Sequence, residues 1–153
     1  RSAGASPMRR ETIGAIRLGT GRRRLVDATA ALLWASGAAW LVAHYFLIRQ
    51  GPYGPQTSPA EPWALRLHGL VAMIALALLG LLWGVHVVRG WRARRARWSG
   101  GALLAVAAVL GVTGYLLYYL GDETLRQGVS WLHWGLGLAA LVVFVAHRVA
   151  PKR

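Results

Sequence analysis

The sequence contains no cysteine. This excludes disulfides, thiolate-bound iron–sulfur clusters, thiol catalysis and a quinone-coupled disulfide oxidase. It also excludes covalent attachment of haem, because that chemistry needs a C-x-x-C-H motif. Charge is scarce too: only 15 % of the 153 residues are charged and 56 % are hydrophobic. This balance is unusual for a soluble domain and typical of a chain that lies mostly in a bilayer.

Long stretches without charged residues make up most of the sequence. Four segments lack Asp, Glu, Lys and Arg over 21 or 22 residues each: Ala28–Ile48, Leu67–Val88, Gly100–Gly121 and Gln127–His147. A helix of about 20 apolar residues crosses the hydrocarbon core of a membrane. The sequence therefore predicts an all-α integral membrane four-helix bundle, with helices at about 25–48, 63–88, 99–120 and 128–149. Strands are not expected, because no stretch alternates with period two and a barrel would need more strands than this length supplies.

The basic residues predict how the bundle is oriented. Of the 18 Lys and Arg, 15 lie in the segment up to Asp27, in the 89–97 connection, or at Arg148, Lys152 and Arg153. A four-span chain brings these regions to one side, so the positive-inside rule predicts that both termini are cytoplasmic. The same charges would bind anionic lipid headgroups. A nucleic-acid surface is the weaker alternative, and we expect no nucleic-acid partner.

The remaining segments divide the chain. Residues 1–7, RSAGASP, precede Met8 and look like an expression-tag remnant, and 8–24 form a basic cytoplasmic segment. Residues 25–150 form the transmembrane domain. The stretch QGPYGPQTSPAEP, with four prolines and two glycines, forms the outer loop between the first two helices. Asp122 and Glu123 lie in the second outer turn, where a helix cap is favoured over a role as proton acceptor.

All five histidines fall in or at the ends of the predicted helices: His44, His68, His86, His133 and His147. An ionisable residue at membrane depth is by default a functional candidate. His68 and His86 are 18 residues apart, and His133 and His147 are 14 apart. Each interval is close to a whole number of helical turns, so each pair shares one helix face, spaced by about 27 Å and about 21 Å. The two helices run in the same direction, which predicts an outer pair, His68 with His133, and an inner pair, His86 with His147.

Two imidazoles that face each other suit the two axial positions of haem b. We expect His68, His133, His86 and His147 to be metal ligands that bind two haems. His44 lies at the depth of the outer pair; it could replace an outer ligand, bind a haem propionate, or accept a proton from a quinol. Gly69, Gly84, Gly135 and Gly137 would leave room for a porphyrin, although glycines equally serve helix packing.

The segment WLHWGLGLAALVVFVAH, which carries His133 and His147, resembles the fourth helix of the small di-haem cytochromes b of bacterial respiratory membranes. That group includes bacterial cytochrome b oxidoreductases and the gamma subunits of formate dehydrogenase and hydrogenase. The resemblance implies haem b, contact with ubiquinone or menaquinone, and electron transfer. The chain departs from the pattern because its first helix lacks a histidine near its inner end, and His86 fits that position instead. The unequal intervals leave an axial mismatch of about 6 Å, which helix or haem tilt would absorb.

We therefore expect electrons to pass through two haems between the quinone pool and a periplasmic or membrane redox partner, or a small oxidant or reductant at the outer face. Whether the chain is itself an oxidoreductase enzyme, the direction of electron flow and the oligomeric state stay open. One alternative is a transition-metal or haem transporter, which would favour Met, Cys or Asp along its path. The other is a structural membrane subunit whose histidines join helices by hydrogen bonds.

Overall fold

The computed structural model describes residues 19–94 and 97–149. The expected tag remnant at 1–7 and most of the basic segment at 8–24 lie outside the described residues. The described chain is almost entirely helical and has four helices that are long and apolar enough to cross a membrane. The helical elements are α1 (Thr20–Tyr45), α2 (Ala60–Leu82), η1 (Trp83–Val88), α3 (Arg89–Arg92), α4 (Arg97–Tyr119) and α5 (Glu123–Val149). The expectation of an all-α chain with four such helices is confirmed.

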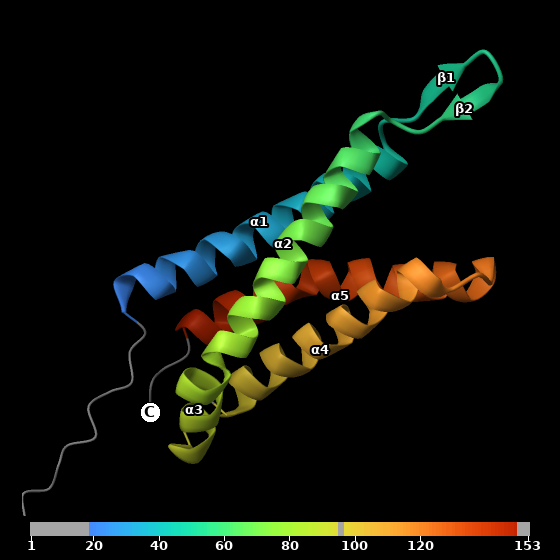
Figure 1. Ribbon diagram of the computed structural model, residues 1–153. Helices are drawn as coiled ribbons and strands as arrows, with labels where there is room; N and C mark the ends of the chain where they lie inside the picture. Colours follow the sequence, from blue (N-terminus) through green and yellow to red (C-terminus); the bar gives the residue numbers. More distant parts are fainter. Residues whose placement is uncertain (1–18, 95–96, 150–153) are drawn as a thin grey trace, which may run out of the picture.

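The four long helices are organised as two antiparallel hairpins. α1 packs along α2, and α4 packs along α5, whereas contacts between the hairpins are sparser and join mainly α1 to α5. Figure 1 shows α2 crossing in front of α5 and inclined to it. It also shows the start of α1 and the end of α5 at the same end of the molecule. We call this the basic end, and the opposite end the loop end.

A short β-hairpin lies in the proline-rich loop, where we expected irregular structure. β1 (Arg49–Gly51) pairs antiparallel with β2 (Gly54–Gln56), with Gly51 opposite Gly54. Pro52 and Tyr53 form the turn, and proline presets the backbone angle that the first turn position needs. Gly54 has a φ of +111°, which a residue with a side chain rarely adopts. The turn residues therefore produce two strands of three residues each, which are too short to show an alternation of period two in the sequence.

The helix that begins at α2 changes its winding near its end. η1 is a π-helical turn that contains His86, and α3 continues from it. A π-turn fits more residues into a given rise, and such turns occur frequently at functional sites. The wide turn therefore adjusts the height and direction of His86, on the helix that carries the longer of the two histidine intervals.

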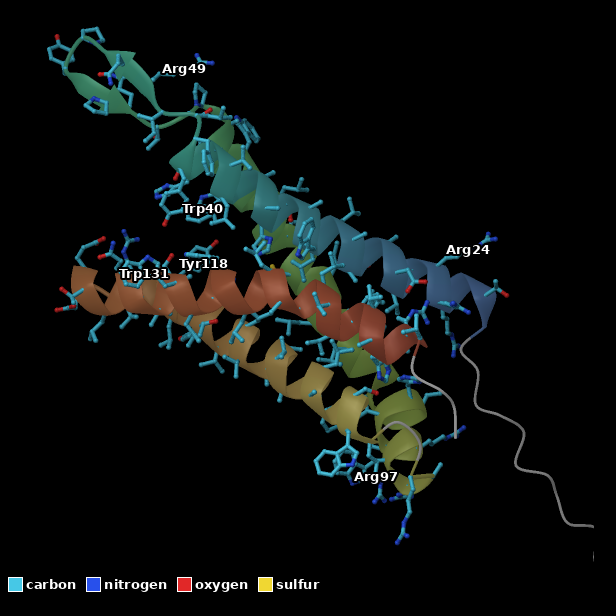
Figure 2. All side chains as sticks on the ribbon, turned by 180° about the vertical axis from the view of Figure 1, so that it is seen from behind. Arg24, Trp40, Arg49, Arg97, Tyr118 and Trp131 are labelled. Carbon is cyan, nitrogen blue, oxygen red and sulfur yellow. The ribbon has the colours of Figure 1, made fainter. Side chains whose placement is uncertain are left out.

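Apolar side chains cover the outside of the bundle. In the most apolar stretch of each long helix, at most 11 % of the residues are buried inside the protein. Figure 2 shows Arg24 and Arg97 at the basic end, and Trp40, Tyr118 and Trp131 toward the loop end. Trp91 and Trp98 are exposed near the basic end as well, so aromatic rings lie toward both ends, as they do at the two interfaces of a membrane-spanning protein.

An ion pair joins the two hairpins at the basic end. Arg148 on α5 donates from Nη2 to both carboxylate oxygens of Asp27 on α1, with 2.6 Å to Oδ1. The side chains are 27 % and 41 % exposed, so water screens this pair only partly. Because few other contacts link the hairpins, the pair contributes to holding α1 against α5.

We predict that Asp27→Asn lowers the free energy of unfolding in detergent by about 1 kcal/mol, at the upper end for partly exposed ion pairs. The matched control is Glu123→Gln, which removes the carboxylate from the more exposed pair with Arg126 at the loop end. Thermal unfolding followed by circular dichroism measures both. Equal effects of the two substitutions would contradict a special role for the Asp27–Arg148 pair.

Candidate metal centres

Four histidines meet as two pairs between the hairpins. The ring centres of His68 on α2 and His133 on α5 are 6.2 Å apart, and their planes are inclined by 88°. The ring centres of His86 and His147 are 6.3 Å apart, with an inclination of 87°. A metal ion bonded to the facing nitrogen of each ring at about 2.0–2.1 Å would hold the ring centres roughly 6 Å apart. Both pairs have the spacing of a bis-imidazole metal centre.

The His68 ring is fixed through its Nδ1 atom. This nitrogen lies 3.0 Å from the carbonyl oxygen of Leu33 and 3.1 Å from Oγ of Ser36, both on α1. A carbonyl only accepts hydrogen bonds, so Nδ1 carries the ring proton and Nε2 keeps its lone pair. The α1 helix thereby selects the tautomer that can bind a metal through Nε2.

Thr113 gives His133 the same tautomer by a less direct route. Its Oγ1 lies 2.8 Å from the carbonyl oxygen of Val109 and 2.8 Å from Nδ1 of His133. The hydroxyl has one proton, which it donates to its own helix, so its oxygen accepts from Nδ1–H of His133. Metal-binding histidines usually donate their second ring nitrogen in this way, which orients the ring and raises its basicity.

A Ser-Gly or Thr-Gly dipeptide lies beside three of the four paired histidines. Ser36-Gly37 contacts His68, Thr113-Gly114 contacts His133, and Ser99-Gly100 contacts His147, with 3.1 Å between Ser99 Oγ and His147 Nδ1. On α4 the two dipeptides are 14 residues apart, the same interval that separates His133 from His147 on α5. This repeat was readable in the sequence, and we missed it.

The glycine of each dipeptide makes room for the neighbouring ring. A Cβ atom added at Gly37 would lie 3.0 Å from Cε1 of His68, and one at Gly114 would lie 3.3 Å from Cε1 of His133. At Gly100 the corresponding distance to His147 is 3.5 Å. Gly84, Gly135 and Gly137, which we expected to leave room for a porphyrin, adjoin open space, because an added Cβ would meet nothing within 4 Å there. At Gly69 an added Cβ would meet only the Tyr118 hydroxyl.

His44 lies apart from both pairs. Its Nδ1 is 2.8 Å from Oε1 of Glu61, the acidic residue in the first turn of α2. Its ring stacks on Trp40 at 4.8 Å and meets Tyr45 edge-on at 4.7 Å. Sequence reasoning did not single out Glu61, because a glutamate at the start of a helix is ordinarily explained by the helix dipole. Asp122 caps α5, where its Oδ1 accepts from the backbone N–H of Leu125 at 2.8 Å.

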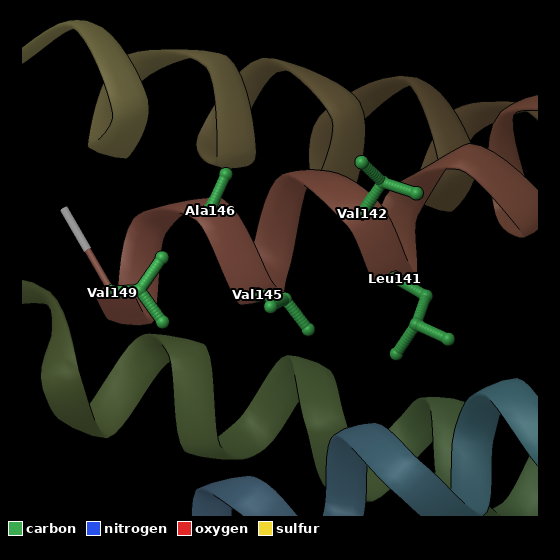
Figure 3. Close-up of a pocket in the computed structure, with 5 residues that line it drawn as sticks. All are labelled: Leu141, Val142, Val145, Ala146 and Val149. Atoms are coloured by element: carbon green, nitrogen blue, oxygen red, sulfur yellow. The ribbon is translucent and has the colours of Figure 1, made fainter.

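An apolar hollow lies on the face of α5 that is turned away from His147. Its volume is about 410 Å³, and Figure 3 shows the residues that line it, all aliphatic: Leu141, Val142, Val145, Ala146 and Val149. These side chains offer no polar ligand, so the hollow is not a candidate metal site. An apolar helix face of this kind suits contact with lipid.

The donor set fits haem b. Within the part of the chain that the structure describes, no third His, Cys, Asp or Glu joins either pair. Zinc is held by three or four protein ligands, whereas the iron of a porphyrin has four ring nitrogens and needs only two axial ligands. Two neutral imidazoles with fixed tautomers, beside glycines that allow the rings to lie close to the helices, would supply two such axial ligands at each pair.

We predict that Thr113→Val weakens binding of ferric haem at the His68–His133 pair by about 10-fold, since changes of this kind cost 10–100-fold in metal affinity. The substitution keeps the shape of the side chain and removes the acceptor of His133 Nδ1–H. Thr124→Val, at an exposed position at the start of α5, is the control. Titration of the haem-free protein with haemin measures both affinities, and an unchanged affinity in Thr113→Val would contradict the role of the hydroxyl.

The comparisons with known proteins identify no relative that carries these histidine pairs. Two histidine pairs have nearly equal ring spacing, with His68–His133 nearer the loop end and His86–His147 nearer the basic end. The chain matches no known family model, and no curated protein or solved structure matches it significantly.

Proposed function

We propose that this chain is a multi-pass protein of a bacterial inner membrane that carries electrons across it through two haems b. The observation that carries the proposal is the repeated histidine pair, with ring centres 6.2 Å apart at the loop end and 6.3 Å apart at the basic end. When bound, haem b supplies an iron that alternates between the ferric and ferrous states. Two such irons would provide one relay near each membrane surface.

The residues of the chain would hold the cofactors and set their properties. His68 and His133 would ligate the haem at the loop end, and His86 and His147 the haem at the basic end. Ligation on both axial sides leaves no coordination position for oxygen, which favours electron transfer over oxygen chemistry. Ser36 and Thr113 would strengthen their histidines as ligands by accepting the Nδ1 protons.

The basic end would face the cytoplasm and the loop end the outer side, which puts both termini in the cytoplasm. Electrons would pass between the quinone pool, ubiquinone or menaquinone, and a periplasmic or membrane redox partner, or a small oxidant or reductant at the outer face. The likeness of WLHWGLGLAALVVFVAH to the small di-haem cytochromes b supports this assignment. The chain carries its own ligands for both haems, and the surrounding membrane lipid would cover its apolar outside.

The alternative for each pair is an edge-to-face ring contact, since aromatic centres 4.5–7 Å apart attract one another. It would account for the ring distances, as in a structural subunit or a transporter. It gives no reason for the same interval between the Ser/Thr-Gly dipeptides on α4 and the histidines on α5, or for imidazoles whose Nε2 atoms keep their lone pairs. Cofactor binding accounts for all of these features.

We predict two haems b per chain in the purified protein, measured as the pyridine haemochrome against protein concentration. His86→Ala and His147→Ala each remove one axial ligand and should leave one haem. His44→Ala is the matched control and should leave two, because His44 pairs with Glu61. A colourless wild-type protein, or loss of haem in His44→Ala alone, would contradict the assignment.

The cysteine-free chain allows a direct test of orientation. Tyr53 in the β-hairpin is 98 % exposed, and Trp98 near the basic end is 93 % exposed, so a cysteine at either position would be accessible to reagents. In intact cells with a permeabilised outer membrane, an impermeant maleimide should label Tyr53→Cys at once. It should label Trp98→Cys only after the inner membrane is opened, and the reverse pattern would overturn the proposed orientation.

A further inference from the structure

The geometry points to an exchangeable ligand at the basic end: His86 leaves its iron and a small neutral diatomic molecule, of the carbon monoxide or nitric oxide class, takes its place. This inference rests on the proposed haem function. It adds a ligand-binding site, which bis-histidine ligation by itself does not provide. Its basis is that His86 lacks the contacts that hold the other three paired histidines.

The first of these contacts is the hydrogen bond at Nδ1. Hydroxyl or carbonyl oxygens on α1 and α4 lie between 2.8 Å and 3.1 Å from Nδ1 of His68, His133 and His147. Among the described residues, neither ring nitrogen of His86 has a hydrogen-bond partner. Such a partner orients a metal-bound ring and raises its basicity, and losing it costs about 10–100-fold in metal affinity. His86 is therefore the weakest of the four ligands.

The backbone that carries His86 is also less supported than that of the other three. α1 packs along α2 and α4 along α5, whereas the π-turn η1 contacts mainly α2 and α3, which continue its own helix. The hydrogen-bond pattern changes on both sides of the turn, where Trp83 N–H donates to the carbonyl of Gly80 and Arg89 N–H to that of His86. A turn of this kind can rewind and withdraw its ring at small cost in packing between helices.

The surroundings of His86 select the class of ligand. Its neighbours in the turn are Val85, Val87 and Val88, and the turn belongs to an apolar stretch long enough to span a membrane. A charged ligand would lose its hydration there without gaining a hydrogen bond, which is costly, whereas a neutral diatomic molecule would not. At Gly84 an added Cβ would meet nothing within 4 Å, so the backbone adjoins open space.

The exchange is a ligand substitution that transfers no electron and no proton. The bond between ferrous iron and Nε2 of His86 breaks, and its electron pair stays on the nitrogen. The carbon lone pair of carbon monoxide forms the new bond, while His147 stays on the opposite side. At the loop end His68 and His133 are both held through Nδ1, so neither leaves.

The test is titration of the haem-loaded, dithionite-reduced protein with carbon monoxide, followed by the visible spectrum. The wild type should bind one carbon monoxide for every two haems. The dissociation constant at the loop-end iron should be higher by about 10-fold or more, the effect of one such partner on a metal-bound histidine. Equal affinity at both irons would overturn the proposal.

Thr113→Val tests the physical reason for the difference. It removes the acceptor of His133 Nδ1–H at the loop end, so that iron should now take carbon monoxide as well, raising the amount bound per chain from one toward two. Thr124→Val, at an exposed position on the same hairpin, is the control and should stay at one. Unchanged binding in Thr113→Val would overturn the account of ligand exchange.

Resonance Raman spectra of the photolysed carbon monoxide adduct identify the histidine that stays. If His147 stays, its Nδ1–H donates to Oγ of Ser99, 3.1 Å away, and this bond strengthens the link between iron and nitrogen. Ser99→Ala should therefore lower the iron–histidine stretching frequency, and Ser36→Ala, which acts on His68 at the loop end, should leave it unchanged. The reverse pattern would place the exchange at the wrong end and overturn the proposal.

Two further outcomes separate this inference from the proposed function. A protein that carries two haems but binds no carbon monoxide would overturn the exchange of His86 and leave the haem assignment standing. A protein that binds no haem would overturn both.

Discussion

Two hydroxyl groups, which donate their hydrogen bonds to the backbone of their own helices, fix the tautomer and orientation of the histidines beside them. Thr113 donates to the carbonyl of Val109 and Ser36 donates to that of Leu33, so each oxygen can only accept from the histidine beside it. The Nδ1–H groups of His133 and His68 are thereby satisfied, and the opposite nitrogens keep their lone pairs. In an apolar bundle an unsatisfied N–H would be costly, so the ring is held in one tautomer and one orientation. The bis-imidazole geometry at the loop end depends on these bonds.

The division into two helical hairpins complements this arrangement. The α1–α2 unit carries His68 and His86, and the α4–α5 unit carries His133 and His147. Each histidine pair therefore bridges the two units, while few side chains do so directly. Haems bound at both pairs would become the main link between the hairpins, and cofactor binding would add to the stability of the folded bundle.

Much of this arrangement could be predicted from the sequence, because helix periodicity reports depth and face. The four uncharged runs predict the four long helices, and the intervals of 18 and 14 residues pair the histidines that the structure brings together. Two features lay beyond that reasoning: the π-turn around His86 and the bond between His44 and Glu61, which joins two helices. The hydroxyl of Thr113 belongs to the Ser/Thr-Gly repeat, which the sequence does carry. The β-hairpin was missed because strands of three residues are too short to show a pattern.

The central claim is that two irons are each held by two imidazoles whose planes are nearly perpendicular, at 88° and 87°. Electron paramagnetic resonance of the oxidised, haem-loaded protein tests it most directly, because the low-spin ferric signal depends on the angle between the axial rings. The account predicts two strongly anisotropic low-spin signals, each with one large g value. A high-spin ferric signal, or the rhombic signal of parallel rings at both irons, would contradict it.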